Sequence, residues 1–459
     1  MLKRFVGDKA FYKMVLALLV PMVIQQGITN FVNLLDNLMI GQLGTEQMTG
    51  VAIVNQLIYI FNLAIFGAVG GASIFGAQFF GAGDKEGVRS SHRFKIYVSV
   101  IFSVIAILIL SFFSNELIGV YLHNSESGGD VAATLHYAKQ YLPIMLVGLL
   151  PYALTQCYAA TLKECGNTFL PMLSGIVAVA TNCVLNYVFI FGKFGAPALG
   201  VAGAAVATVI ARFVELAIIL IAAHREKYPY IKGVYKTLKI PGKLIGSIVM
   251  KSSPLVINEI MWALSRAMIA QLCSVRGLYA LSATNITDTV VNLFFITFFS
   301  IGNVIGIVAG QHLGAGEVDK AKDSVRKLMA LNLVCCIVIG VVLVGVAPLI
   351  PDMYNTTTQV KELAAIFLMI CGVMMPVFSF SHGCYFVLRC GGKTGITFLF
   401  DSVFNWVIVI PAMFAMVHFT SLNIITIYLC VQLADVLKGV FGFWLVKKGV
   451  WINNVVENI

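Results

Sequence analysis

The chain has 459 residues, of which 59% are hydrophobic and only 11% are charged, and its mean hydropathy is +0.91. A water-soluble domain carries roughly 25% charged residues, so this composition excludes a soluble globular protein and predicts an integral membrane protein. The formal net charge of +10 needs no nucleic-acid partner, because membrane topology accounts for where the basic residues lie.

Twelve apolar stretches follow one another along the chain. Stretches of about 20 residues or more predict membrane-spanning helices, because the strands of a membrane barrel are shorter and alternate apolar with polar residues. In chain order they cover 14–40, 49–76, 94–114, 133–160, 168–192, 199–224, 247–274, 279–310, 327–350, 362–388, 395–418 and 424–446. We therefore predict an all-α membrane protein with twelve transmembrane helices.

Lysine and arginine gather on one side of these predicted helices. If the N-terminus lies inside, the connections on the inner side hold 24 of the 31 basic residues. The opposite side holds four, which are Lys139, Lys193, Arg276 and Lys361. Because cytoplasmic connections are enriched in Lys and Arg, we predict a multi-pass protein of the cell inner (plasma) membrane with both termini cytoplasmic.

The first half of the chain recurs in the second half. At a constant offset of 233 the sequence pairs Pro21 with Pro254, Gly44 with Gly277, Gln78 with Gln311, Gly81 with Gly314, Gly83 with Gly316 and Arg93 with Arg326. A second offset of 226 pairs residues 162–168 with 388–394. Six helices in each repeat imply parallel topology about an axis along the membrane normal. We predict two six-helix lobes with pseudo-two-fold symmetry: an N-lobe (1–224), a basic linker (225–246) and a C-lobe (247–459).

The linker allows two interpretations. It is a cytoplasmic connection that sets the topology, or it forms an amphipathic surface helix that touches anionic lipid. The second interpretation rests on four apolar residues interleaved with three lysines: Val234, Tyr235, Leu238 and Ile240 with Lys236, Lys239 and Lys243. We do not expect a substrate site there.

Asp36 is the first candidate for chemistry, because a carboxylate inside a membrane helix is costly and usually functional. Its helix carries a polar stripe at helical spacing: Gln26, Thr29, Asn30, Asn33, Asp36 and Asn37. Asn182 and Asn186 stand four residues apart and share a helix face. We predict that Asp36, Asn182 and Asn186 bind and couple a cation, a proton or Na⁺, with Na⁺ held at Asp36 and Asn182. The alternative is a hydrogen-bonded cluster that only joins helices.

The repeat does not reproduce Asp36, whose counterpart is Ile269. The C-lobe carries its polar residues at other positions, so we predict a second cation site or a negative lining that attracts organic cations. Its candidates are Glu259, Asp288, Asp401 and Asn405. The alternative is that each packs against Arg266 or against the backbone.

Two further pairs of charges are expected to be structural. Arg212 and Glu215 lie three residues apart, as do Asp435 and Lys438. Residues at this spacing are neighbours on a helix surface, so each pair is predicted to neutralise itself.

Three motifs together resemble the multidrug and toxic compound extrusion (MATE) family of cation-coupled efflux transporters, within the MOP superfamily. They are Leu34-Leu35-Asp36-Asn37 followed by Gly41 and Gly44; the paired Gln78…Gly83 and Gln311…Gly316; and residues 388–394 with their partner at 162–168. The resemblance spans essentially the whole chain. It implies an antiporter that exports cationic amphipathic compounds by alternating access in exchange for H⁺ or Na⁺, with Asp36, Asn182, Asn186 and Glu259 as site residues.

This sequence combines features of two branches of that family. The pair Asn182 and Asn186 is similar to the NorM-like branch, whereas the DinF-like branch often has an acid where this chain has Asn186. Residues 363–388 lack the acid that the NorM-like branch often carries. The coupling ion stays open between Na⁺ and H⁺.

The chief alternative function is a flippase for lipid-linked oligosaccharide or peptidoglycan precursors, which shares the same superfamily fold. Such proteins commonly have extra helices and a cationic cavity, whereas this sequence predicts twelve helices and an acidic interior. A channel or receptor does not explain the duplication. The ten cysteines lack Cys-x-x-Cys spacing and no P-loop is present. We therefore expect no enzyme, no cofactor, no nucleic acid, and a monomer that meets only small cationic substrates and the lipid bilayer.

Overall fold

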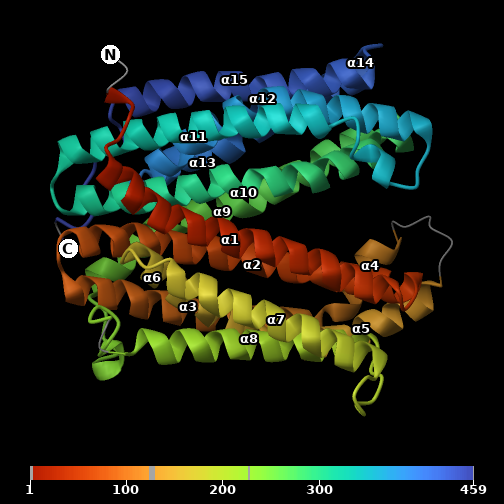
Figure 1. Ribbon diagram of the computed structural model, residues 1–459, viewed down its shortest axis with the longest axis horizontal. Coiled ribbons are helices and arrows are strands. Elements are labelled where there is room, and N and C mark those ends of the chain that lie inside the picture. Colours follow the sequence, from red (N-terminus) through yellow and green to blue (C-terminus); the bar gives the residue numbers. More distant parts are fainter. Residues whose placement is uncertain (1–3, 124–129, 226–227, 458) are drawn as a thin grey trace. The chain divides into compact units, whose positions relative to one another are not determined.

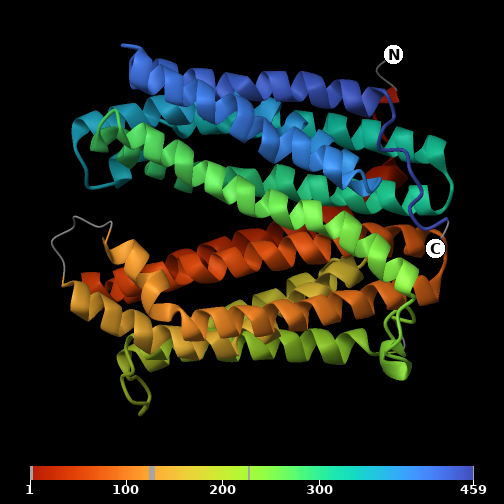
Figure 2. The same ribbon diagram turned by 180° about the vertical axis from the view of Figure 1, so that it is seen from behind.

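The computed structural model describes the chain apart from residues 1–3, 124–129, 226–227 and 458. The described part is built of helices without strands (Figures 1 and 2). In the first half these are α1 (Lys9–Gly41), α2 (Thr45–Gly81), α3 (Lys85–Phe112), α4 (Ser114–His123), α5 (Val131–Val147), α6 (Leu149–Glu164), α7 (Phe169–Phe191) and α8 (Val201–Ala223). Long apolar helices satisfy every backbone donor and acceptor internally, which hydrocarbon surroundings require.

The second half continues the same pattern. Its helices are α9 (Gly242–Ser274), α10 (Leu278–Gly314), α11 (Val318–Val346), α12 (Thr358–Cys390), α13 (Thr394–Phe398), η4 (Leu399–Val403), η5 (Asn405–Val409), α14 (Ile410–Phe419) and α15 (Ile424–Lys447), with short 3₁₀ turns η2 (Val234–Lys236) and η3 (Pro351–Met353). The segments η4 and η5 are π-helical. Figures 1 and 2 show α12 and α15 side by side.

The prediction of twelve membrane-spanning helices is confirmed. Within the described residues, eleven helices are long and apolar enough to cross a membrane, and the bent pair α5 and α6 makes the twelfth span. The bend of 45° falls at Gly148, between the two helices. Arg212 donates to the Gly148 carbonyl oxygen at 3.1 Å and stacks over the Tyr152 ring at 5.2 Å.

That arrangement corrects one predicted ion pair. Arg212 and Glu215 share a helix face, but they form no salt bridge. The Arg212 guanidinium instead donates to the Gly148 carbonyl oxygen at the bend, which also accepts from the Tyr152 backbone N–H at 3.2 Å.

The helices group into two compact units. Unit 1 contains the chain up to Leu19, Ala77–Asp84 and Ser247–Ile459; unit 2 contains Val20–Gly76 and Lys85–Gly246. The helices α1 and α2 each pass from one unit to the other. The predicted N-lobe and C-lobe, with a separate linker between them, remain a prediction.

The repeated glycines have a structural cause within unit 1. At Gly81 the end of α2 lies so close to α10 that an added Cβ would overlap the carbonyl group of Gln311, and at Gly314 an added Cβ would overlap the carbonyl group of Gln78. The two helix ends therefore meet through the same motif. Gly83 and Gly316 follow them, each with a φ of +74°, a conformation that favours glycine.

The crossing gives a first prediction. Gly314→Ala is expected to destabilise the protein by about 1–3 kcal/mol, the usual cost of forcing an extra methyl group into a close-packed contact. Gly306→Ala, in the same helix, has open space at its Cβ position and serves as the control. Unfolding in detergent measures both; equal stability of the two variants would show that the crossing tolerates a side chain.

The interpretation of the linker as an amphipathic surface helix does not hold. Within the described residues 228–241, only Val234–Lys236 is helical, as one 3₁₀ turn, and α9 begins at Gly242. Val234, one of the four apolar residues on which that interpretation rests, is fully buried, and its carbonyl accepts from Arg93 of α3. The other predicted apolar residues, Tyr235 and Leu238, are exposed.

Candidate functional site

Asp36 lies in a polar cluster of unit 2 that α1, α7 and α8 build together. The Asn186 amide nitrogen donates to an Asp36 carboxylate oxygen at 2.6 Å. Asn182 and Asn186, four residues apart on α7, are both buried and lie 3.2 Å apart through their amide groups. The Thr208 hydroxyl of α8 lies 3.2 Å from the Asn182 amide. The structure thus brings the three predicted N-lobe residues together.

The neighbours of the Asn182 amide fix its orientation. With its nitrogen toward Asp36, the amide donates to both carboxylate oxygens, at 2.9 and 3.2 Å, and its oxygen accepts from the Thr208 hydroxyl. The reverse orientation would place an amide oxygen against the carboxylate oxygens, which can only accept when the carboxylate is ionised.

Within the described part of the chain, the carboxylate of Asp36 has no cationic partner. Among the residues that the structure describes, no Lys, Arg or His comes within ion-pairing distance of it. The side-chain oxygen of Asn186 is also buried without a hydrogen-bond donor in that part of the chain. The cluster therefore offers a carboxylate and amide oxygens, which are suitable ligands for a small hard cation or a proton.

The sequence did not reveal Thr208, the fourth member of the cluster. Its only signal is a hydroxyl one helical turn before Arg212 in an otherwise apolar helix. Hydroxyl groups in such helices usually bond to their own backbone, so the residue type alone does not predict a role.

A second polar cluster lies in unit 1, around Asp401. One Asp401 oxygen pairs with the Lys438 ammonium at 2.5 Å, and the other accepts from Asn258 at 3.1 Å. Ser402 donates to the Asn258 side chain at 2.7 Å. Asp401, Asn258 and Lys438 are all buried, so the charge of Asp401 is matched within the protein.

The π-helical segment η4 explains how consecutive residues enter this cluster. Phe400, Asp401 and Ser402 are all buried, although three successive residues of a regular α-helix span more than half of its circumference. A π-turn inserts an extra residue and commonly occurs at functional sites. It turns Asp401 and Ser402 together toward α9 and α15.

The cluster corrects the second predicted pair. Lys438 pairs with Asp401, 37 residues away, and not with its helix neighbour Asp435. The backbone carbonyl of Asp435 accepts a hydrogen bond from the Ser381 hydroxyl. Spacing along one helix did not predict the partner, because the charge on a neighbouring helix lies closer.

The remaining C-lobe candidates are separated from one another. Glu259 follows Asn258 and accepts from the Tyr385 hydroxyl at 3.2 Å, so it borders the Asp401 cluster. Asp288 pairs with Arg266 at 2.5 Å, and both side chains are partly exposed. Asn405 begins the second π-helical segment, η5. Only Glu259 and Asp401 therefore come together around Asn258 and Tyr385.

A third cluster, which sequence reasoning missed, lies between α3 and α6 in unit 2. The Lys95 ammonium contacts both oxygens of Glu164, at 2.5 and 2.6 Å, and the Thr161 hydroxyl at 3.1 Å. His92 bonds to the same hydroxyl at 2.8 Å. Lys95 is fully buried and Glu164 is 3% exposed. In the sequence, Lys95 stands out only as one of several basic residues near the start of the predicted span 94–114, and nothing there connects it with Glu164.

Comparison with known proteins identifies the family. A family model described as MatE matches residues 21–188 and 254–414, two stretches that begin at the repeated prolines Pro21 and Pro254. A relative from Thermotoga maritima, named probable multidrug resistance protein NorM, is 25% identical and covers 92% of this chain and 89% of its own length. The multidrug resistance protein MdtK of Pectobacterium atrosepticum is 24% identical over 86% of this chain and 85% of its own.

Solved structures show the same fold. A mutant of a MATE transporter from Vibrio cholerae superposes with a TM-score of 0.87 at 18% identity, covering 96% of this chain and 97% of that one. A MOP superfamily transporter from Pyrococcus furiosus, for which a binding pocket of reversed polarity suggests a different function, superposes with a TM-score of 0.83 at 16% identity over 98% and 97%. The chain therefore belongs to the MatE family, the multidrug and toxic compound extrusion (MATE) family of efflux transporters.

Proposed function

We propose that this transporter exports cationic amphipathic compounds in exchange for H⁺ or Na⁺, in the inner membrane with both termini cytoplasmic. The observation that carries the proposal is the unmatched carboxylate of Asp36. In the described structure it accepts hydrogen bonds from the amide groups of Asn186 and Asn182, whereas Asp401 is neutralised by Lys438. The names of the curated relatives, which are multidrug resistance proteins, support the class of substrate.

Coupling follows if the cation and the substrate favour different conformations. Uptake of the cation at Asp36 removes the negative charge that attracts a cationic substrate, so that the substrate leaves on the outer side. Each ligand shifts the conformational equilibrium only by its difference in affinity between the two states, and linked sites typically differ by about 1–3 kcal/mol. In this scheme Glu259, beside Tyr385, contributes negative charge to a substrate site.

One experiment tests this proposal and identifies the ion. Energised vesicles that contain the protein are loaded with a fluorescent organic cation, and the Na⁺ and proton gradients are collapsed separately. We expect collapse of one of them to stop the efflux and collapse of the other to leave it unchanged. Efflux that survives the loss of both gradients would contradict antiport and would favour the flippase class.

A further inference from the structure

The segment that joins α8 to α9 is a fastened strap rather than a loose loop. We call residues 228–241 the strap. Because α8 and α9 are both membrane-spanning helices, the strap joins two spans at one surface of the membrane. Ile231 and Val234 are 1% and 0% exposed, so they anchor it to the rest of unit 2.

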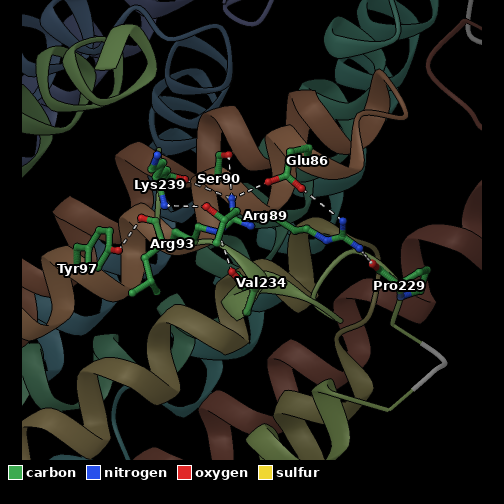
Figure 3. A network of polar contacts seen from close by, with 10 residues as sticks. Glu86, Arg89, Ser90, Arg93, Tyr97, Pro229, Val234 and Lys239 are labelled. Atoms are coloured by element: carbon green, nitrogen blue, oxygen red, sulfur yellow. Dashed lines mark hydrogen bonds and ion pairs between the residues drawn. The ribbon is translucent and has the colours of Figure 1, made fainter. Parts of the chain in front are cut away.

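Donors from α3 hold the strap by its backbone. Arg93 donates to the Val234 carbonyl at 2.7 Å and reaches that of Lys239 at 3.5 Å (Figure 3). Arg93 is itself held by Glu86 at 2.6 Å. Arg89 donates to the Pro229 carbonyl at 2.9 Å. Since the contacts use carbonyl groups, they fix the course of the strap without using its side chains.

Tyr97 places the C-terminal part of the strap, around Leu238, at the level of the lipid headgroups. It begins an exposed stripe on α3 that continues through apolar residues at helical spacing: Ile101, Val104, Ile105 and Leu108. Exposed apolar residues of a membrane span face lipid, and tyrosines at the ends of such stripes lie at the interface. The Tyr97 hydroxyl donates to the Leu238 carbonyl at 2.7 Å.

The exposed side of the strap is basic and partly apolar. Leu238 is 64% exposed, and Lys236 and Lys239 on either side are exposed too. Between Tyr228 and Asn258 the sequence contains no Asp or Glu, so no acid of the strap itself balances these lysines.

A second group of basic residues, at the start of α11, is paired with acids. Lys320 pairs with Glu317 at 2.7 Å, and Lys322 pairs with Asp319 at 3.8 Å. Hydrogen bonds from Lys320 and His312 lower the pKa of Glu317, as expected for a carboxylate with cationic neighbours. These lysines are therefore a matched set whose charge is already balanced.

We propose that Lys236, Leu238 and Lys239 form a docking surface for anionic phospholipids of the bilayer. The two ammonium groups bind the headgroup phosphate, and Leu238 enters the boundary of the acyl chains. A basic segment next to a span attracts anionic headgroups with a contribution from each lysine, and the fastened backbone holds these side chains in place beforehand.

The test counts bound lipid on the full chain. Purified protein in detergent is titrated with phosphatidylglycerol or phosphatidylcholine, and native mass spectrometry measures the bound fraction. The K236Q/K239Q variant is expected to bind phosphatidylglycerol up to about 25-fold more weakly, since each lysine contributes about fivefold. Binding of phosphatidylcholine is expected to be unchanged.

The K320Q/K322Q variant is the matched control. It removes the same number of charges, and we expect it to bind phosphatidylglycerol like the unmodified protein. Size-exclusion chromatography checks that both variants are folded. We expect both to elute like the unmodified protein, because the exchanged lysines are exposed. Unchanged phosphatidylglycerol binding by K236Q/K239Q, or an equal loss in both variants, would overturn the proposal.

Discussion

Replacing Asp36 by Asn is expected to lower gradient-driven efflux by a factor of about 5 to 150, the range spanned by typical coupling energies between linked sites. The amide has the shape of the carboxyl group and keeps an oxygen that accepts from Asn186. It carries no charge, however, so it neither takes up a proton nor attracts Na⁺. The rate of efflux of a fluorescent cation from energised vesicles measures the effect.

A matched control removes a carboxylate outside the spans. Asp352 lies in the short turn η3 and pairs with Lys361 at 3.6 Å, with its side chain 71% exposed. We expect Asp352→Asn to transport like the unmodified protein. Full efflux by Asp36→Asn, at equal amounts of protein in the membrane, would remove Asp36 from the coupling mechanism.

The second large effect is expected on stability. Glu164→Gln leaves the Lys95 ammonium buried without a counter-charge, and breaking a buried ion pair by removing one partner costs about 3–5 kcal/mol. The pair is almost fully shielded from solvent, so screening by water does not reduce this value. The free energy of unfolding in detergent measures it.

The double variant Lys95→Met with Glu164→Leu distinguishes the effect of an unpaired buried charge on stability from the effect of altered packing. Replacing both partners of a buried pair by apolar residues of similar size is often neutral or stabilising, so we expect it to recover most of the lost stability. Lys320→Gln, which affects an exposed pair, is expected to leave unfolding unchanged. Equal stability of Glu164→Gln and the unmodified protein would mean that the pair does not stabilise unit 2.

The sequence predicted the fold well, because the features that define it are local. Apolar runs long enough to cross a membrane identify each span, and the repeat with offset 233 points to the positions where the backbone has special requirements. Gly81 and Gly314 recur because two helix ends cross there, and Gly83 and Gly316 recur because each turn needs a positive φ.

The Asp36 cluster could also be predicted, but only in part. A carboxylate on an apolar helix and two asparagines four residues apart are visible signals, and the structure joins them. Thr208 carries no such signal. Helical spacing predicts the polar stripe of α1 that contains Asp36. The side chain of Asn33, one member of that stripe, lies outside the described residues.

The partners of the buried charges could not be predicted from the sequence, because they lie on different helices that only the tertiary structure brings together. Spacing along one helix predicts that Arg212 and Lys438 pair with acids on their own helices. Arg212 instead donates to the Gly148 carbonyl oxygen, and Lys438 pairs with Asp401. Lys95 and Glu164 are 69 residues apart, so spacing cannot connect them. The π-turn that buries Asp401 beside Ser402 depends likewise on packing between helices rather than on residue type.

The central claim is that Asp36 couples cation movement to substrate movement, and counterflow tests it most directly. Purified protein is reconstituted into proteoliposomes with equal ion concentrations on both sides, and a gradient of an organic cation is imposed. We predict that the unmodified protein drives H⁺ or Na⁺ in the opposite direction, and that Asp36→Asn drives neither. Ion counterflow of the same size in Asp36→Asn would contradict the account.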